Sequence, residues 1–299
     1  MINYSKFVEN SRKWLSQYIK DNHLQSIIIG ISGGIDSTVS CAIAFPVCEE
    51  LNIPLIGRSL PTGTNKQSEC DVADLVGNAF CINYKVVALD RTYFEIEEKF
   101  IGEEGPISDL QKGNIKARLR MIYLRHLASV YKGVVLDNDN FTEWNLGFWT
   151  VEGDSPMDIN LGLHYLWKTE VYELADYLCT ECMESTIPIK HNLQSKAILE
   201  SMKLIPTDGN GVSNSDCEQF GLNNYDQVDD VLQTMYYNDK FFEQWAESSQ
   251  IYKGPHPQYI RLINDYNEQG VDKVMILHQN TAYKRKELPI KPSKEELGL

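Results

Sequence analysis

The stretch Gln25-Ser26-Ile27-Ile28-Ile29-Gly30-Ile31-Ser32-Gly33-Gly34-Ile35-Asp36-Ser37 decides the fold. Its first half is a β-branched run that ends in small residues, which predicts a buried parallel strand. The two adjacent glycines allow backbone N–H groups to turn inward without a Cβ clash. A helical pattern begins at Ser37, so a tight loop joins a strand to a helix N-terminus. Such a loop is typical of an anion-binding cradle, because the helix dipole favours negative charge there.

Strands and helices alternate along the first part of the chain. The expected strands span 25–31, 54–57, 84–89 and 133–136, and the expected helices span 4–21, 37–50, 68–80, 113–131 and 168–178. This order predicts an α/β fold with a doubly wound, mostly parallel sheet and helices on both faces. Ligands of such sheets bind at the carboxyl ends of the strands. We expect one domain over 1–299, with the irregular and helical residues 185–299 packed on it as a C-terminal extension.

Charge and composition narrow the class of protein. The 299 residues carry a formal net charge of -14, which disfavours a nucleic-acid partner because affinity for polyanions comes largely from Lys and Arg. The sequence contains no apolar run of about 18 residues, the length that a membrane span needs. Its first residues lack the pattern of a secretory signal. Seven irregularly spaced cysteines favour a reducing compartment. We therefore expect a cytoplasmic protein without a membrane or nucleic-acid partner.

The glycine-rich loop has the chemistry of a phosphate site. Ser32 and Ser37 add hydroxyl donors to the backbone N–H groups. The carboxylate of Asp36 would repel phosphate, so its presence suggests that it holds Mg²⁺, which bridges to the phosphates. A Walker A loop would need a Lys that is missing here, and the glycine spacing is not that of a dinucleotide fingerprint. The alternative is a glycine-rich turn with a helix-capping Ser.

The Ser-Gly-Gly-x-Asp-Ser form resembles the pyrophosphate loop of the N-type ATP pyrophosphatases, which cleave ATP into AMP and pyrophosphate. The resemblance implies a Rossmann-like fold of the adenine nucleotide alpha hydrolase-like type. It also implies ATP contacts from Gly30, Ser32, Gly33, Gly34, Asp36 and Ser37.

Further motifs resemble those of one branch of this superfamily, the NAD synthetases. They are Leu60-Pro61-Thr62-Gly63, Gly113–Met121, Gly147–Thr150 with Gly153-Asp154, Lys168–Ala175, Pro206–Gly209 with Ser215–Gly221, and Lys284-Arg285. The segment Gly113–Met121 matches the family's nine-residue motif almost completely. The resemblance runs from the first helix to about residue 290. Because no amidase-like segment precedes these motifs, the resemblance is to the ammonia-dependent form.

This resemblance implies a role for each matching residue. Asp36 and Glu143 would hold Mg²⁺, and Lys168 and Thr207 would contact ATP phosphates. Asp36, Glu143 and Lys168 would also be the catalytic residues. Those expected to bind the second substrate are Asn114, Arg118, Phe148, Trp149, Asp154, Lys284 and Arg285.

The implied reaction amidates deamido-NAD with ammonia, using ATP as co-substrate and passing through an adenylated carboxylate. The resemblance also implies a homodimer. Two alternatives stay open: a ligase of the same superfamily that adenylates a different carboxylate, and a nucleotide-binding regulator with weak or no catalysis.

Several positions depart from the family pattern. Asp137-Asn138 replace Gly-Thr, which alters a phosphate-side contact and adds negative charge, and Tyr283 replaces a His. Ser59 replaces an Arg, with Arg58 one position earlier. Val151-Glu152 replace Lys-Tyr, so a cation near the nicotinate site is lost. We expect weaker binding of the dinucleotide as a result, unless another cation such as Lys116 or Lys284 occupies its place.

We expect Asp36→Ala and Glu143→Ala each to lower turnover by at least about 100-fold, because charge stabilisation by a bound metal ion amounts to several kcal/mol. Steady-state rates at saturating Mg²⁺ measure the effect. A near-normal rate in either variant would remove that residue from the metal site.

Overall fold

The computed structural model describes residues 2–184, 188–207, 215–238, 245, 256–286 and 291–299. In this part of the chain a five-stranded sheet has the order β3-β2-β1-β4-β5, and all its neighbouring strands are parallel. The strands are β1 Ser26–Gly30, β2 Leu55–Ser59, β3 Asn83–Val86, β4 Gly133–Asp137 and β5 Ile159–Asn160. The expected parallel sheet is therefore confirmed.

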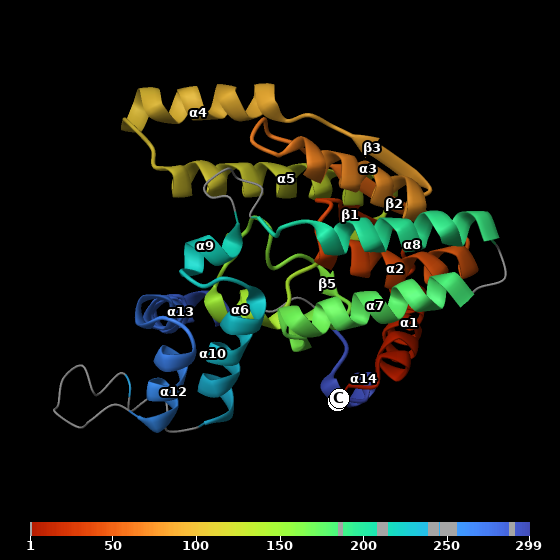
Figure 1. Cartoon of the computed structure of the whole chain (residues 1–299). Helices are drawn as coiled ribbons and strands as arrows, with labels where there is room; N and C mark the ends of the chain where they lie inside the picture. Colours follow the sequence, from red (N-terminus) through yellow and green to blue (C-terminus); the bar gives the residue numbers. More distant parts are fainter. Residues whose placement is uncertain (1, 185–187, 208–214, 239–244, 246–255, 287–290) are drawn as a thin grey trace.

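Helices cover both faces of this sheet (Figure 1). Ile27 and Ile29 of β1 belong to one core and Ile28 to the other, because alternate side chains of a strand point to opposite faces. The first face carries α1 Tyr4–Asp21, α2 Ile35–Glu50, α3 Gln67–Phe80, α7 Lys168–Glu184 and α8 Pro188–Lys203. The second face carries α4 Asp90–Glu104 and α5 Asp109–Tyr131.

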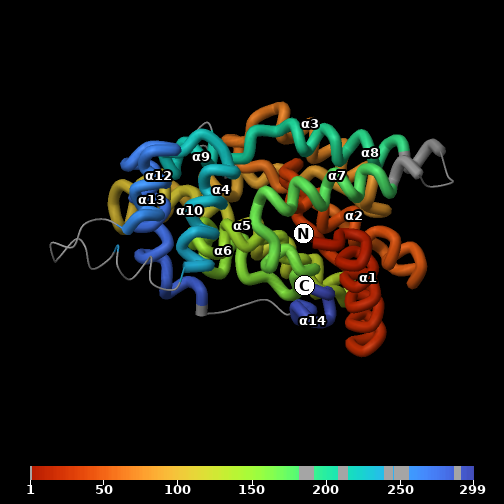
Figure 2. The backbone as a smooth tube through the Cα atoms, turned by 60° about the horizontal axis from the view of Figure 1, so that its bottom comes forward, coloured from red at the N-terminus to blue at the C-terminus, as the bar shows by residue number. Residues whose placement is uncertain are grey.

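A third hydrophobic cluster, which we call the C-terminal core, lies beyond the end of the sheet. It is built from α6 Phe141–Leu146, α9 Asp216–Phe220, α10 Tyr225–Tyr237, α12 Pro257–Asp265 and α13 Glu268–Asn280. Leu146 and Trp167 join it to the segments that follow β4 and β5. After the 3-10 turn Ala282–Lys286, the last helix, α14 Lys294–Leu297, returns to α1 and buries Leu297 (Figure 2).

The structure differs from the sequence-based expectation in several elements. Helix α4 was not expected, because its buried face is small: Tyr93 is its only buried residue, whereas Phe94 is 57% exposed. The region after residue 185 was expected to be irregular, yet α8 is a regular helix that packs on α7 and α3. Helix α7 extends six residues beyond its expected end at Leu178, to Glu184. Part of the region 185–299, which was expected to be irregular and helical, lies outside the described residues.

The loop between β1 and α2 depends on Gly33. Its backbone φ of +86° is one that residues other than glycine rarely adopt. A Cβ at this position would also lie 2.6 Å from the carbonyl oxygen of Glu69 and 3.0 Å from the backbone nitrogen of Ala73, so α3 closely backs the loop. Among the described helices, none is long and apolar enough to cross a membrane.

Candidate active site

The β1–α2 loop forms the first wall of the site. Gly34 is the N-cap of α2 and contributes no side-chain cap, so backbone N–H groups of the first turn are left for an anion. The loop is held by its hydroxyl groups: Ser32 Oγ accepts from Gly34 N at 3.1 Å and lies 3.2 Å from Ser37 Oγ. Ser37 and Thr38 both donate to the Gly34 carbonyl. We call residues 30–37 the phosphate cradle, after the role that the sequence predicts for them.

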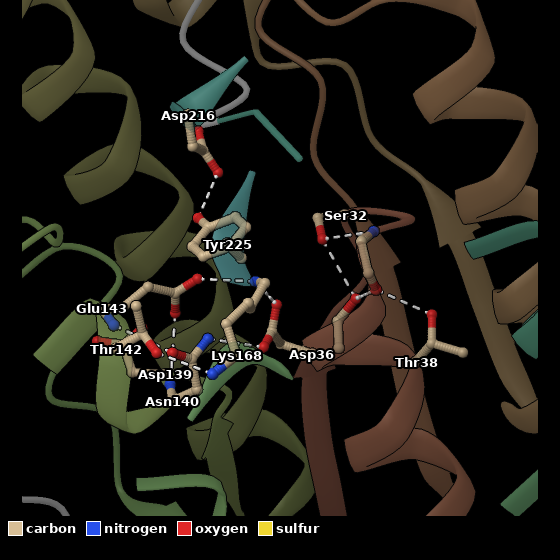
Figure 3. A network of polar contacts seen from close by, with 12 residues as sticks. Ser32, Asp36, Thr38, Asp139, Asn140, Thr142, Glu143, Lys168, Asp216 and Tyr225 are labelled. Carbon is tan, nitrogen blue, oxygen red and sulfur yellow. Dashed lines mark hydrogen bonds and ion pairs between the residues drawn. The ribbon is translucent and has the colours of Figure 1, made fainter. Parts of the chain in front are cut away.

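Three elements bring their charged side chains together beside this loop (Figure 3). Lys168, the first residue of α7, places its Nζ 2.5 Å from Asp36 Oδ2 and 3.0 Å from Glu143 Oε1. Asp36 comes from the first turn of α2 and Glu143 from α6. The ring of Tyr225 lies 5.2 Å from the same ammonium. The predicted catalytic residues are thus neighbours, although they are far apart in the sequence.

The electrostatics of this group favour a cation between the two carboxylates. Burial alone would lower the pKa of Lys168, but the charges of Asp36 and Glu143 outweigh it and raise that pKa well above its ordinary value. Burial raises the pKa of Glu143 to about 7, against the opposing effect of Lys168. One ammonium contacts both carboxylates, so they are close enough to share a divalent ion. Oxygen ligands of this kind fit Mg²⁺.

A cavity of about 290 Å³ opens above the carboxyl ends of the strands. Many of the predicted ligands line it: Gly30, Ser32, Gly34, Asp36, Ser37, Glu143, Phe148, Asp154, Lys168 and Thr207. Thr207 also donates a 2.6 Å hydrogen bond to Glu69. The other predicted ligands are outside the cavity lining: Gly33, Asn114, Arg118, Trp149, Lys284 and Arg285.

The cations of the Gly113–Met121 motif have different environments. Lys116 is 3% exposed and donates to Thr64 Oγ1, and Arg120 donates to the Leu60 carbonyl and to Thr62 Oγ1. Both therefore hold the loop after β2 against α5. Arg118 instead donates to the Val151 carbonyl at 3.2 Å.

The 147–154 segment is held by side chains from several elements. Asn114 accepts from Thr150 Oγ1 at 2.9 Å, and Asp154 accepts from Thr150 N at 2.5 Å. Phe148 packs edge-on against Phe220, whereas Trp149 is 5% exposed and stacks on Trp144 with ring centroids 5.5 Å apart. Phe148 thus faces the cavity while Trp149 belongs to the wall behind it.

Lys284 is held against the 147–154 segment, in which Val151 replaces the family's Lys. Its Nζ donates to the carbonyls of Gly147 and Trp149, at 2.7 and 2.5 Å. Burial lowers the pKa of Lys284, partly offset by the charge of Asp154. Lys116 is bound to the 60–65 loop instead, so Lys284 is the better candidate for the replacement cation. Arg285 donates to the carbonyl oxygens of Asn145 and His278.

The negative charge of Asp137 is fully buried, and its side chain is outside the cavity lining. Its carboxylate accepts from the backbone of Asp139 and Met157 and from the side chains of Ser155 and Asn160. Burial would raise the pKa of Asp137, but His164 and these donors lower it. Asp137, Asp139 and His164 have ligand atoms within 4.8 Å of one another. Because the Asp137 oxygens already accept these hydrogen bonds, we assign the group a structural role.

Two residues beside Asp36 and Lys168, Asn140 and Tyr225, were not predicted from the sequence. Asn140 Nδ2 donates to Asp36 at 2.9 Å, and Asn140 also caps α6 in a capping box with Glu143. The Asn-x-x-Glu spacing was a usable signal for this helix start. Tyr225, whose hydroxyl donates to Asp216 at 3.0 Å, carries no comparable signal.

The parallel sheet and the loop between β1 and α2 define a fold of the adenine nucleotide alpha hydrolase-like class. Solved structures agree with this fold. The chain superimposes on an NMN synthetase from Francisella tularensis with a TM-score of 0.70 and 22% identity, covering 98% of this chain and 100% of that one. An NH3-dependent NAD synthetase from Campylobacter jejuni gives a TM-score of 0.65 at 20% identity, covering 97% and 99%.

The sequence comparisons are more specific. The NAD synthase family model matches residues 7–288, and the chain belongs to that family. An NH(3)-dependent NAD(+) synthetase of Thermoplasma volcanium is 30% identical over 236 residues, which are 79% of this chain and 86% of the relative. Another from Syntrophomonas wolfei is 36% identical over 169 residues, or 56% of this chain and 66% of the relative.

Proposed function

We propose that this protein catalyses the ATP-dependent amidation of deamido-NAD by ammonia, giving NAD, AMP and pyrophosphate. One observation carries the proposal: the glycine-rich cradle and the Asp36–Lys168–Glu143 group line the same cavity in a chain of the NAD synthase family. An unactivated carboxylate is a poor acyl donor, and adenylation supplies its leaving group.

In the first step, an oxygen of the nicotinate carboxylate attacks the α-phosphorus of ATP. The bond from this phosphorus to the oxygen shared with the β-phosphate breaks, and pyrophosphate leaves. The protein mainly positions the reactants and neutralises charge. In this proposal Ser32, Gly34, Ser37 and Lys168 stabilise the pyrophosphate side. Asp36 and Glu143 would hold Mg²⁺, which would supply charge neutralisation on the phosphates.

In the second step, the ammonia nitrogen attacks the carbonyl carbon of the mixed anhydride. AMP leaves with the electron pair of the broken C–O bond, and the nitrogen loses a proton. Phe148 and Asp154 line the cavity next to the cradle, which supports a role in holding the nicotinate ring. No protein nucleophile is needed in either step.

Incubation with ATP, deamido-NAD, Mg²⁺ and ammonium, followed by chromatography, tests the proposal. We expect NAD and AMP in equal amounts. A parallel incubation with nicotinate mononucleotide is needed, because one similar structure is an NMN synthetase. AMP formed only with a different carboxylate would favour the altered-substrate ligase. Nucleotide binding without AMP formation would favour the regulator.

We propose that Lys284 supplies positive charge to the part of the site that binds the nicotinate group of deamido-NAD. We expect Lys284→Met to raise the Michaelis constant for deamido-NAD by about 5- to 150-fold, as loss of about 1–3 kcal/mol implies. The constant for ATP should stay within about twofold. Val151→Lys should change neither constant by more than about twofold, because Lys284 already occupies the segment. A large improvement in Val151→Lys would show instead that the lost cation had not been replaced.

We also propose that the protein is a cytoplasmic homodimer. Helix α5 supports this, since it exposes Leu110, Ile122 and Val130, at 72%, 65% and 56%. A second copy of the chain that packed on α5 would cover these apolar side chains. Light scattering should give about twice the 34.2 kDa chain mass. Ile122→Glu should give the monomer, while Ile276→Glu, on α13, should not; a monomeric parent protein would contradict the dimer.

A further inference from the structure

A buried carboxylate of the C-terminal core reaches the base of the site. Asp229 lies on α10 and is 2% exposed. Three uncharged donors bind its carboxylate: Thr142 Oγ1 at 2.5 Å, Thr169 N at 2.9 Å and Thr169 Oγ1 at 2.9 Å. Asp229 is not part of the cavity lining, and none of the motifs described above contains it.

Two of these contacts fix the start of α7. The first N–H groups of a helix have no partner within the helix, and a carboxylate near them is favourable. Thr169 N donates to Asp229, and the preceding N–H, that of Lys168, donates to Thr142 Oγ1 at 2.8 Å. The carboxylate of Asp229 thus holds the turn from which the Lys168 side chain extends.

The third contact fixes α6. Thr142 immediately precedes Glu143, and its hydroxyl accepts from Lys168 N while it donates to Asp229. One carboxylate therefore sets the positions of two helices whose side chains meet at 3.0 Å, Glu143 on α6 and Lys168 on α7. We propose that Asp229 is a positioning residue for the reaction, acting through Thr142 and Thr169 on Glu143 and Lys168. The proposal rests on the proposed function.

An ionised carboxylate at Asp229 does not stabilise the fold. Burial raises the pKa of Asp229 to about 6, although its donors oppose the shift. A group whose pKa is raised on folding binds its proton more tightly in the folded state. Its ionisation above that pH therefore weakens the fold. A neutral side chain of the same shape would avoid this cost, so stability and function should respond in opposite directions.

Asp229→Asn tests this separation. We expect kcat to fall by at least about 10-fold, since small misplacements of reacting groups lower rates steeply. The Michaelis constant for ATP should rise by at least about fivefold, whereas the melting temperature at pH 8 should be unchanged or higher. Thr142→Val should lower kcat similarly. Because both residues act through one bridge, the double variant should lose much less than the product of the two single effects.

Asp230→Asn is the matched control on the same helix. Asp230 pairs with Arg261 at 2.8 and 3.1 Å and accepts from the Tyr266 hydroxyl, away from α6 and α7. These partners lower its pKa although burial would raise it, so its charge supports the fold. We expect Asp230→Asn to lower the melting temperature and leave kcat within about twofold.

The outcomes are distinct. A normal kcat in Asp229→Asn overturns the proposal, and so does a parallel loss of stability and kcat in the two aspartate variants. If the parent protein forms no NAD, the proposed reaction fails. Calorimetric binding of ATP with Mg²⁺ then decides: Asp229→Asn weakens it at least about fivefold if Asp229 positions the site, and equal affinity rejects that role.

Discussion

The ammonium of Lys168, shared by the carboxylates of Asp36 and Glu143, is the interaction on which the site depends. Buried charges are costly unless each is paired and hydrogen-bonded. The sheet meets this requirement through its strand order. Strand β4 lies between β1 and β5, so the segments that follow these three strands emerge side by side. They lead into α2, α6 and α7, which carry the three groups.

The C-terminal core is part of this arrangement and not a separate addition. Helix α10 contacts both α6 and α7, so its packing sets the wall opposite the phosphate cradle. Tyr225, at the start of α10, turns its ring toward the ammonium of Lys168. The loops after the strands supply the phosphate cradle, while α6 and α9 of the C-terminal core contribute Glu143 and Asp216 to the cavity lining.

The sequence predicted the elements that have a regular local pattern. It predicted few of the contacts between residues that are far apart in the chain. The β-branched runs and the loop from Ser32 to Ser37 predicted the sheet and the cradle, because local pattern and burial agree there. Helix α4 was missed since it buries so little. Asp229 could not be recognised, because it is one of 42 acidic residues and Thr142 is 87 positions away. The donors around Asp137 could not be recognised either, because one of them, Asn160, is 23 positions away.

The geometry at Gly33 has a consequence for how this chain can vary. Two separate obstacles close the position to any side chain, the left-handed backbone and the α3 backbone where a Cβ would lie. A second mutation that relieves one obstacle leaves the other, so no single compensating change opens the position. Substitutions can accumulate in the part of the cavity proposed to bind the nicotinate group, while the phosphate cradle keeps its shape. Distant relatives should therefore differ first in what they amidate and last in how they hold the phosphates.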